Sequence, residues 1–327
     1  MAVEEIRART AALGTLDIVK RNVPILLSYL IVVLLFVAGT AKASGFGSGN
    51  HIRILALQAS FIGMIGLGQT MCILTGGIDL SVPWTFTGAA ILTSILAKGD
   101  SSKLPQVLLL VLALAIAVGL VNGIGVAYVG VPPIIMTLGT NGALQGLLLV
   151  YTKGGISSFP PPALNSWVLE TTAAIPNLLW IWIAVMVFGT VVLSFTTLGR
   201  RLYGIGTNRD ASYLAGVNVR RTLVLPYVFS AVGAAGAGVL FMGFNGQAFL
   251  TMGDPYLFAS AAAVAVGGAS ILGGNGHYLG TVAGALVLTL LNALLVLFSL
   301  GTGYLLISYG AVLLIAVFVA NVRLTRG

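Results

Sequence analysis

The chain has 327 residues, of which 58% are hydrophobic and only 7% are charged, and its mean hydropathy is +1.05. Soluble domains carry roughly 25% charged residues, and a soluble core could not bury this much apolar surface, so the composition indicates a membrane protein. The net charge of +8 is therefore attributed to membrane topology, because no soluble domain is left to bind nucleic acid.

Long apolar runs follow one another along the whole chain, each close to the ~20 residues that a helix needs to cross a bilayer. They lack the alternation of barrel strands, so we predict helices. The sequence thus indicates an all-α membrane protein with about ten transmembrane helices in a single domain that covers residues 1–327. The runs are 24–40, 54–75, 82–97, 105–129, 132–151, 176–198, 223–243, 256–272, 279–299 and 304–322.

An even number of spans places both termini on the same side of the membrane. Eleven of the sixteen Lys and Arg residues lie on that side, in the N-terminal segment 1–22, the central loop 198–222 and the C-terminal tail. The positive-inside rule makes this side cytoplasmic. Residues 3–19 are expected to form either a short amphipathic helix on the cytoplasmic face or a charged tail, followed by an uncleaved first span.

Two acidic residues lie beside or within the apolar runs. Asp79 sits in TGGIDLSVPW, where two glycines and Pro83 interrupt an apolar stretch. It is expected either to cap the helix that follows or to line a translocation pathway. Asp254, followed by a proline in TMGDPYLF, is expected to cap the next helix. So few carboxylates do not require ion coupling.

Small and polar residues also show a helical spacing. Three glycine pairs lie four residues apart, and this spacing is typical of tightly packed membrane helices. They are Gly119 with Gly123, Gly142 with Gly146, and Gly280 with Gly284. In VPPIIMTLGTNGALQG, Thr137, Asn141 and Gln145 follow at i, i+4 and i+8. This weakly polar stripe either lines a path for a neutral solute or makes hydrogen bonds between helices.

The central loop LGRRLYGIGTNRDASYLAGVNVRR contains five arginines and one aspartate. Asn208 and Asp210 signal the start of a short helix, and Gly216 signals its end. The apolar side chains of this helix are expected to point outward, where they suit docking into a groove on a partner protein. They are Ala211, Leu214, Ala215 and Val217.

Motifs for enzyme chemistry are absent from the sequence. The single Cys72 excludes an internal disulfide, and His51 and His277 fall on opposite sides of the membrane, so no metal site is predicted. There is neither a nucleotide-hydrolysing loop nor a hydrolase motif. The chain is therefore not expected to be an enzyme or to bind a cofactor, and energy from ATP would have to come from a partner.

Four stretches together resemble the ribose-type permeases of bacterial ABC importers: LTGGIDLSV, VPPIIMTLGTNGALQGL, GRRLYGIGTNRDASYLAGVNV and AVAVGGASILGGNGHYLGTVAGAL. Their order and spacing match from about Asn50 to the last span. Two positions depart from the family pattern. Arg209, Asp210 and Ser212 replace paired glutamates and alanines, and Pro83-Trp84 replaces glycine and serine.

The resemblance implies a multi-pass permease subunit of the inner membrane that works by alternating access. Its partners would be a cytoplasmic ATPase, which holds ATP and Mg²⁺, a second copy or sister permease, and a periplasmic binding protein that delivers a sugar or sugar-like solute. It also implies a coupling segment in the central loop that contacts the ATPase, formed here by Gly206, Asn208, Ala211, Leu214, Gly216 and Val217, with Asp210 in its first turn. An ion-coupled secondary transporter of a small polar solute is the alternative.

Overall fold

The computed structural model describes residues 23–155 and 159–324, and these form helices in all ten predicted runs. The predicted N-terminal amphipathic segment lies outside the described residues. The long helices are Val23–Lys42, α2 (Gly49–Leu74), α3 (Val82–Ala97), α4 (Leu104–Ile124), α5 (Pro133–Thr152), α7 (Asn177–Phe195), α10 (Val219–Asn245), α11 (Tyr256–Val266), α12 (Tyr278–Leu297) and α13 (Thr302–Leu324).

Proline helps to set where several of these helices begin. Its fixed φ suits the first turn of a helix, where a missing N–H costs nothing. Pro83, Pro105 and Pro133 occupy the first turn of α3, α4 and α5 in this way. At the far end of α4, the chain continues as a π-helical turn, η2 (Gly125–Val129), before the glycine at 130 ends it in a left-handed conformation.

Seven of the helices are long and apolar enough to cross a membrane, judged by length and composition. The helices α3, with 16 residues, and α11, with 11, are shorter. At 1.5 Å per residue they reach only about 24 Å and 17 Å, less than the ~30 Å of a bilayer core. The predicted run 256–272 is helical only to Val266, because Gly267 and Gly268 end the helix.

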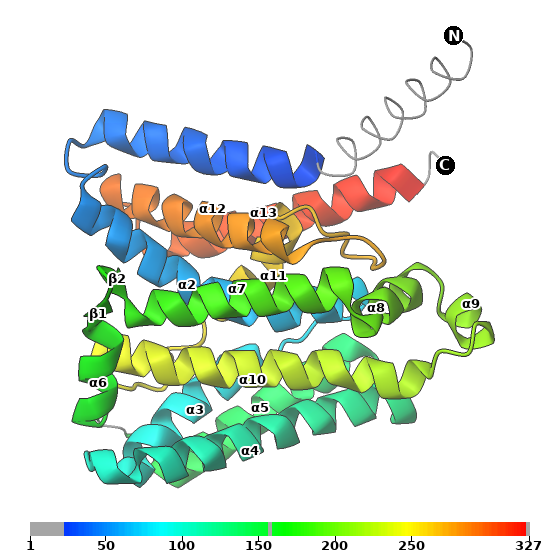
Figure 1. The fold of residues 1–327 in the computed structure, drawn as a ribbon, viewed down its shortest axis with the longest axis horizontal. Helices are drawn as coiled ribbons and strands as arrows, with labels where there is room; N and C mark the ends of the chain where they lie inside the picture. The colour runs from blue at the N-terminus through cyan, green and yellow to red at the C-terminus, as the bar shows by residue number, and fades with distance from the viewer. Residues whose placement is uncertain (1–22, 156–158, 325–327) are drawn as a thin grey trace.

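The centre of the fold is α10, which packs against α2, α3 and α4 (Figure 1). The helices α2 and α12 pack together, and α11 lies against both. By contrast, the helix Val23–Lys42 and α5 bury only 11% of their apolar windows within the chain, whereas α2 buries 94%. The molecule therefore has a tightly buried centre and leaves α5 largely uncovered.

Two of the three predicted glycine pairs pack against another helix. A Cβ at Gly119 or Gly123 would meet the backbone of α10 at Val228 or Val224, and a Cβ at Gly280 or Gly284 would meet the backbone of α11. These four positions need glycine because the helix backbones approach so closely. The third pair, Gly142 and Gly146 on α5, has no atom within 4 Å and faces open space.

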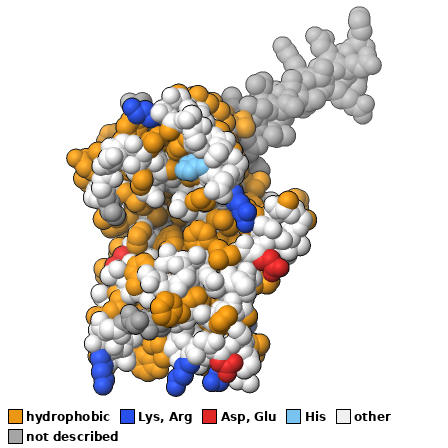
Figure 2. Space-filling model, turned by 90° about the vertical axis from the view of Figure 1, so that its left-hand side faces the viewer, with side chains coloured by type: hydrophobic (Ala, Val, Ile, Leu, Met, Phe, Trp, Pro, Cys, Tyr) orange, Lys and Arg blue, Asp and Glu red, His pale blue; other side chains and the backbone are white. Residues whose placement is uncertain are grey.

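The two ends of the bundle differ. One end carries the small elements α6 (Pro162–Leu169), β1 (Thr171–Thr172) and β2 (Ile175–Pro176), which pair antiparallel, and η1 (Ser101–Lys103). Seen from this end, its charged side chains are few and scattered (Figure 2). The other end carries α8 (Thr197–Thr207) and α9 (Arg209–Leu214), which projects beyond the other helices, and the described chain ends also lie there (Figure 1).

Candidate functional site

The central loop forms the predicted short helix, α9. Its N-cap is Asn208, whose side-chain Oδ1 accepts a hydrogen bond from the backbone N–H of Ala211 at 2.9 Å. At the other end, the N–H of Gly216 donates to the Tyr213 carbonyl at 2.9 Å, and Gly216 has φ +81°. An L side chain is strained at that φ, so the glycine lets the chain reverse into α10.

Most of the apolar side chains of α9 are exposed, as predicted. Leu214 is 84% exposed and Tyr213 is 70% exposed, and Ala211 and Ala215 are exposed too. The prediction is wrong for Val217. The turn after Gly216 folds this residue back, so that Val217 packs with Ile205 of α8 and with the first turn of α10. The outward surface of α9 therefore centres on Leu214, whereas Tyr213 is exposed at a cleft beneath the helix.

Gly206 lies in α8 rather than on the outward surface of α9. A Cβ at this position would collide with the carbonyl oxygen of Leu74, the last residue of α2, and with the backbone nitrogen of Gly274. These two groups are themselves joined, because the Gly274 N–H donates to the Leu74 carbonyl at 2.9 Å. The helix that carries α9 thus rests directly on the end of α2 and on the loop between α11 and α12.

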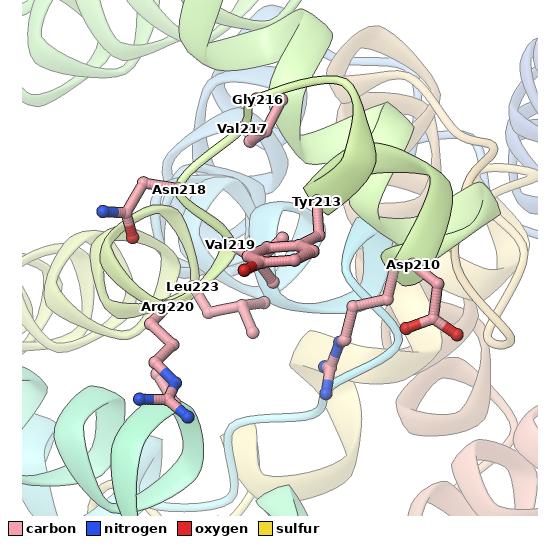
Figure 3. Close-up of a pocket in the computed structure, with 10 residues that line it drawn as sticks. Asp210, Tyr213, Gly216, Val217, Asn218, Val219, Arg220 and Leu223 are labelled. Carbon is pink, nitrogen blue, oxygen red and sulfur yellow. The ribbon is translucent and has the colours of Figure 1, made fainter.

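A cleft of about 850 Å³ lies beneath α9, and we call it the α9 cleft (Figure 3). Its apolar wall includes Ala127 of η2 and Leu223 of α10. Arg209 and Arg220 also line it, and Figure 3 shows Asp210 and Arg220 on opposite sides of the Tyr213 ring. Asp210 was predicted to start the helix and occupies its first turn. A negative charge at this position interacts favourably with the helix dipole.

Asp79 lies in the break between α2 and α3 and is fully buried. Its Oδ1 accepts hydrogen bonds from the backbone N–H of Ser81 at 2.9 Å and from the Ser81 hydroxyl at 2.6 Å, and the Ser230 hydroxyl of α10 also lies near the carboxylate. Ser81 precedes α3, so Asp79 does not cap its first turn. The N–H of Trp84 in that turn instead donates to Oδ1 of Asn141, at 3.3 Å.

The predicted polar stripe of α5 makes contacts that hold this break. The Thr137 hydroxyl, also fully buried, accepts the Leu80 N–H at 3.0 Å and donates to the Pro133 carbonyl at 2.9 Å. Together with Asn141, it ties α5 to the start of α3. Gln145 is exposed on α5 and makes no recorded hydrogen bond among the described residues. The structure therefore brings Asp79, Thr137 and Asn141 together but leaves Gln145 apart.

Asp254 does not cap α11 as predicted. The N-cap is Pro255, with no side-chain cap bond, and Asp254 contributes only its backbone carbonyl, which accepts the N–H of Leu257 at 3.2 Å. The reason is local: residues 251–255 form a turn that shifts the first helical residue to Tyr256.

Sequence reasoning missed two polar residues that complete the α2–α3 break. The Nδ2 of Asn122, on α4, donates to the Ser81 hydroxyl at 2.9 Å, and its Oδ1 accepts a hydrogen bond from the Thr140 hydroxyl at 2.6 Å. An asparagine within the apolar run 105–129 was the available signal, since a polar side chain in a membrane helix needs a partner. Within residues 23–155 and 159–324, no group of three His, Cys, Asp or Glu side chains is placed to hold a metal ion.

Comparison with known proteins identifies similar chains. The family model described as "Branched-chain amino acid transport system / permease component" matches residues 52–321. The ribose import permease protein RbsC of Escherichia coli K12 is 34% identical over 297 residues, covering 89% of this chain and 91% of the relative. RbsC of Haemophilus influenzae is 33% identical with the same coverage.

A further relative, the autoinducer 2 import system permease protein LsrC of Salmonella paratyphi B, is 30% identical over 268 residues, covering 82% of this chain and 77% of the relative. No solved structure matches the chain.

Proposed function

Because the chain belongs to the family of these permease components, as a ribose-type ABC permease of the inner membrane, we propose that it imports a sugar or sugar-like solute. The relatives import ribose or autoinducer 2. The family is one of transport permeases rather than enzymes. In this proposal a periplasmic binding protein delivers the solute, and a separate ATPase subunit holds ATP and Mg²⁺.

We propose that the end carrying α8 and α9 faces the cytoplasm, with both termini. The described chain ends lie at this end (Figure 1), and the five arginines of the central loop lie there too. The positive-inside rule supports this orientation. About ten spans would then include α3 and α11, each completed by the irregular chain beside it, which is tolerated at membrane depth where protein covers it.

The observation that carries the proposal is the exposed apolar surface of α9. Leu214 faces outward from a capped helix at the cytoplasmic end and Tyr213 is exposed at the cleft beside it, and exposed apolar side chains of this kind favour a binding site for another protein. We propose that the ATPase subunit binds here. Asn208 and Gly216 then set the two ends of the helix, Ala211 and Leu214 touch the partner, and Gly206 and Val217 seat the helix on the transmembrane core.

Movement of α9 would reach the centre of the membrane through contacts already described. Gly206 meets the end of α2 at Leu74, five residues before Asp79. Thr137 and Asn141 join the same break to α5. We propose that ATP-driven closure of the ATPases displaces this unit and switches the access of a central cavity from one side to the other.

We place the translocation pathway between two permeases, along α5. This helix buries little within the chain, and Gly142 and Gly146 leave its open face flat enough for close approach of a second copy or a sister permease. Gln145 and Asn141 would offer the polar groups of the path. Asp79 and Thr137 would act behind them by holding the α2–α3 break.

The test replaces Leu214 with Asp. Since Leu214 is 84% exposed, the substitution should leave the fold and membrane insertion unchanged, while a charge in the apolar contact should weaken ATPase binding and abolish uptake. Burying a leucine contributes roughly 1.5–3 kcal/mol, so binding should weaken by about 10- to 150-fold. Leu214→Met and Leu300→Asp, the latter at the opposite end, serve as controls. Normal uptake by the Leu214→Asp variant would contradict the docking site.

Ion-coupled transport is the second candidate, because Asp79 is a buried carboxylate that has no Lys, Arg or His partner in an ion pair among the described residues. It predicts solute uptake that follows an ion gradient in vesicles that contain this chain alone. ATP-dependent uptake that requires a bound ATPase would exclude it.

A further inference from the structure

The α9 cleft carries two arginines and one aspartate, Asp210, so its lining keeps one net positive charge. Arg209, from the first turn of α9, and Arg220, from the first turn of α10, both line the cleft and are exposed. Within the residues that the structure describes, the one ion pair joins Lys103 to Asp100 at the other end of the molecule. Neither arginine of the cleft therefore has a carboxylate of the described residues within ion-pair distance, and this includes Asp210 beside them.

Contacts with the rest of the cleft hold Arg220 in place. Its guanidinium carbon lies 6.0 Å from the centroid of the Tyr128 ring of η2, a cation–π contact. Stacking uses the face of the guanidinium and leaves its N–H groups, which lie in the plane, free to donate. Val219 and Leu223, two members of a buried apolar cluster, line the cleft together with the arginines. The N–H groups of Arg220 are thus held at the cleft, where they can donate to an anion.

From this geometry we propose that the α9 cleft receives an acidic side chain of the ATPase subunit, held between Arg209 and Arg220. The inference rests on the proposed function and adds the chemistry of the contact. A carboxylate fits because two guanidinium groups can each donate to it with charge-assisted hydrogen bonds. We favour a protein over a lipid headgroup because the cleft is lined by α9, which projects beyond the other helices (Figure 1), by η2, which continues the far end of α4, and by the start of α10.

This contact would change how force passes into the membrane. Leu214 projects from α9 into the surroundings, whereas the arginines lie in the cleft beneath the helix. A partner that touched only Leu214 would hold α9 from its outer side alone. A carboxylate bound in the cleft would contact the helix on its inner side as well. The ATPase could then move α9 in both directions during one transport cycle.

The test measures binding of the ATPase subunit that copurifies with the chain to the permease in nanodiscs of neutral phosphatidylcholine. The variants are Arg209→Glu, Arg220→Glu and the double variant, with Arg200→Glu as the matched control. Arg200 is also exposed at this end but lines a different pocket. We expect each charge reversal in the cleft to weaken binding by roughly 10-fold, and the double variant by about 100-fold, whereas Arg200→Glu changes it little.

The salt dependence and a rescue give independent readouts. Binding to the unaltered permease should weaken at high salt, and the double variant should lose most of this dependence. Crosslinking should locate the acidic residue of the ATPase, and its replacement by lysine should restore binding to the double variant. A rescue of this kind would not follow from a merely structural role of the arginines.

Several results would overturn the inference. If the charge reversals leave ATPase binding unchanged while Leu214→Asp weakens it, the docking site stands and the α9 cleft has no role. If neither change affects binding, the proposed coupling function fails as well. An effect of Arg200→Glu equal to that of the cleft variants would reduce the contact to general charge attraction. An effect seen only in nanodiscs with anionic lipid would assign the cleft to a lipid headgroup.

Discussion

Replacing Gly206 with Ala tests whether α8 must rest directly on α2. The new Cβ would collide with the Leu74 carbonyl oxygen and the Gly274 nitrogen, and neither backbone atom can rotate away. Overpacking of this kind costs typically about 1–3 kcal/mol. Separating α8 from α2 also endangers the 2.9 Å hydrogen bond between Gly274 and Leu74, which contributes roughly 0.5–1.5 kcal/mol. The higher helix propensity of alanine offsets at most about 1 kcal/mol of this cost.

The free energy of unfolding should therefore fall by about 0.5–3.5 kcal/mol, which is the cost of the clash and the lost hydrogen bond less the gain in helix propensity. Gly204→Ala is the matched control, two residues away in the same helix, where the nearest atom to a new Cβ is the Ser212 hydroxyl at 3.2 Å. That variant should be as stable as the unaltered chain or up to about 1 kcal/mol more stable. Denaturant titration of both variants in the same detergent measures the difference. Equal stability of the two variants would refute the close contact between α8 and α2.

Two other substitutions test the packing of the transmembrane core. Thr137→Val keeps the shape of the side chain but removes the acceptor of the Leu80 N–H. The free energy of unfolding should therefore fall by about 1–3 kcal/mol. A variant that unfolds like the unaltered chain would contradict this hydrogen bond. Gly284→Ala should destabilise the monomer by about 1–3 kcal/mol because the new Cβ meets the Ala263 carbonyl. Gly142→Ala should not destabilise it, because no atom lies within 4 Å of that position. Thermal unfolding of the two variants measures this difference.

The apolar runs predicted the helices well because membrane helices satisfy their backbone internally, and their sequence must be apolar along nearly the whole length. The short helix α9 was also predictable, since Asn208 and Gly216 act on neighbouring backbone atoms. Local rules of this kind depend on the chain within a few residues. They say little about which helix lies beside which.

The role of a residue in the α2–α3 break could not be predicted for the same reason. Asp79 was expected either to cap α3 or to line the pathway, but Asn141 from α5 accepts the first-turn N–H in place of a cap by Asp79. That contact joins residues 57 positions apart in the sequence. Likewise, Val217 was expected to face outward because its own turn does not reveal the apolar cluster on the neighbouring helices α8 and α10. In both cases, contacts with other helices determine where the side chain lies, and the neighbouring residues in the sequence do not reveal those contacts.

The three glycine pairs share one sequence pattern, but they differ in whether another helix of the chain packs against them. All three pairs have the same spacing, yet those of α4 and α12 are filled by the backbones of α10 and α11, while that of α5 meets nothing within 4 Å. A glycine that touches nothing contributes no packing and lowers helix stability, so the chain alone gives no reason for it. The same helix ties down the α2–α3 break through Thr137 and Asn141. A second permease seated on α5 would therefore contact the helix that α9 is proposed to move, which joins the pore and the ATPase contact in one mechanical unit.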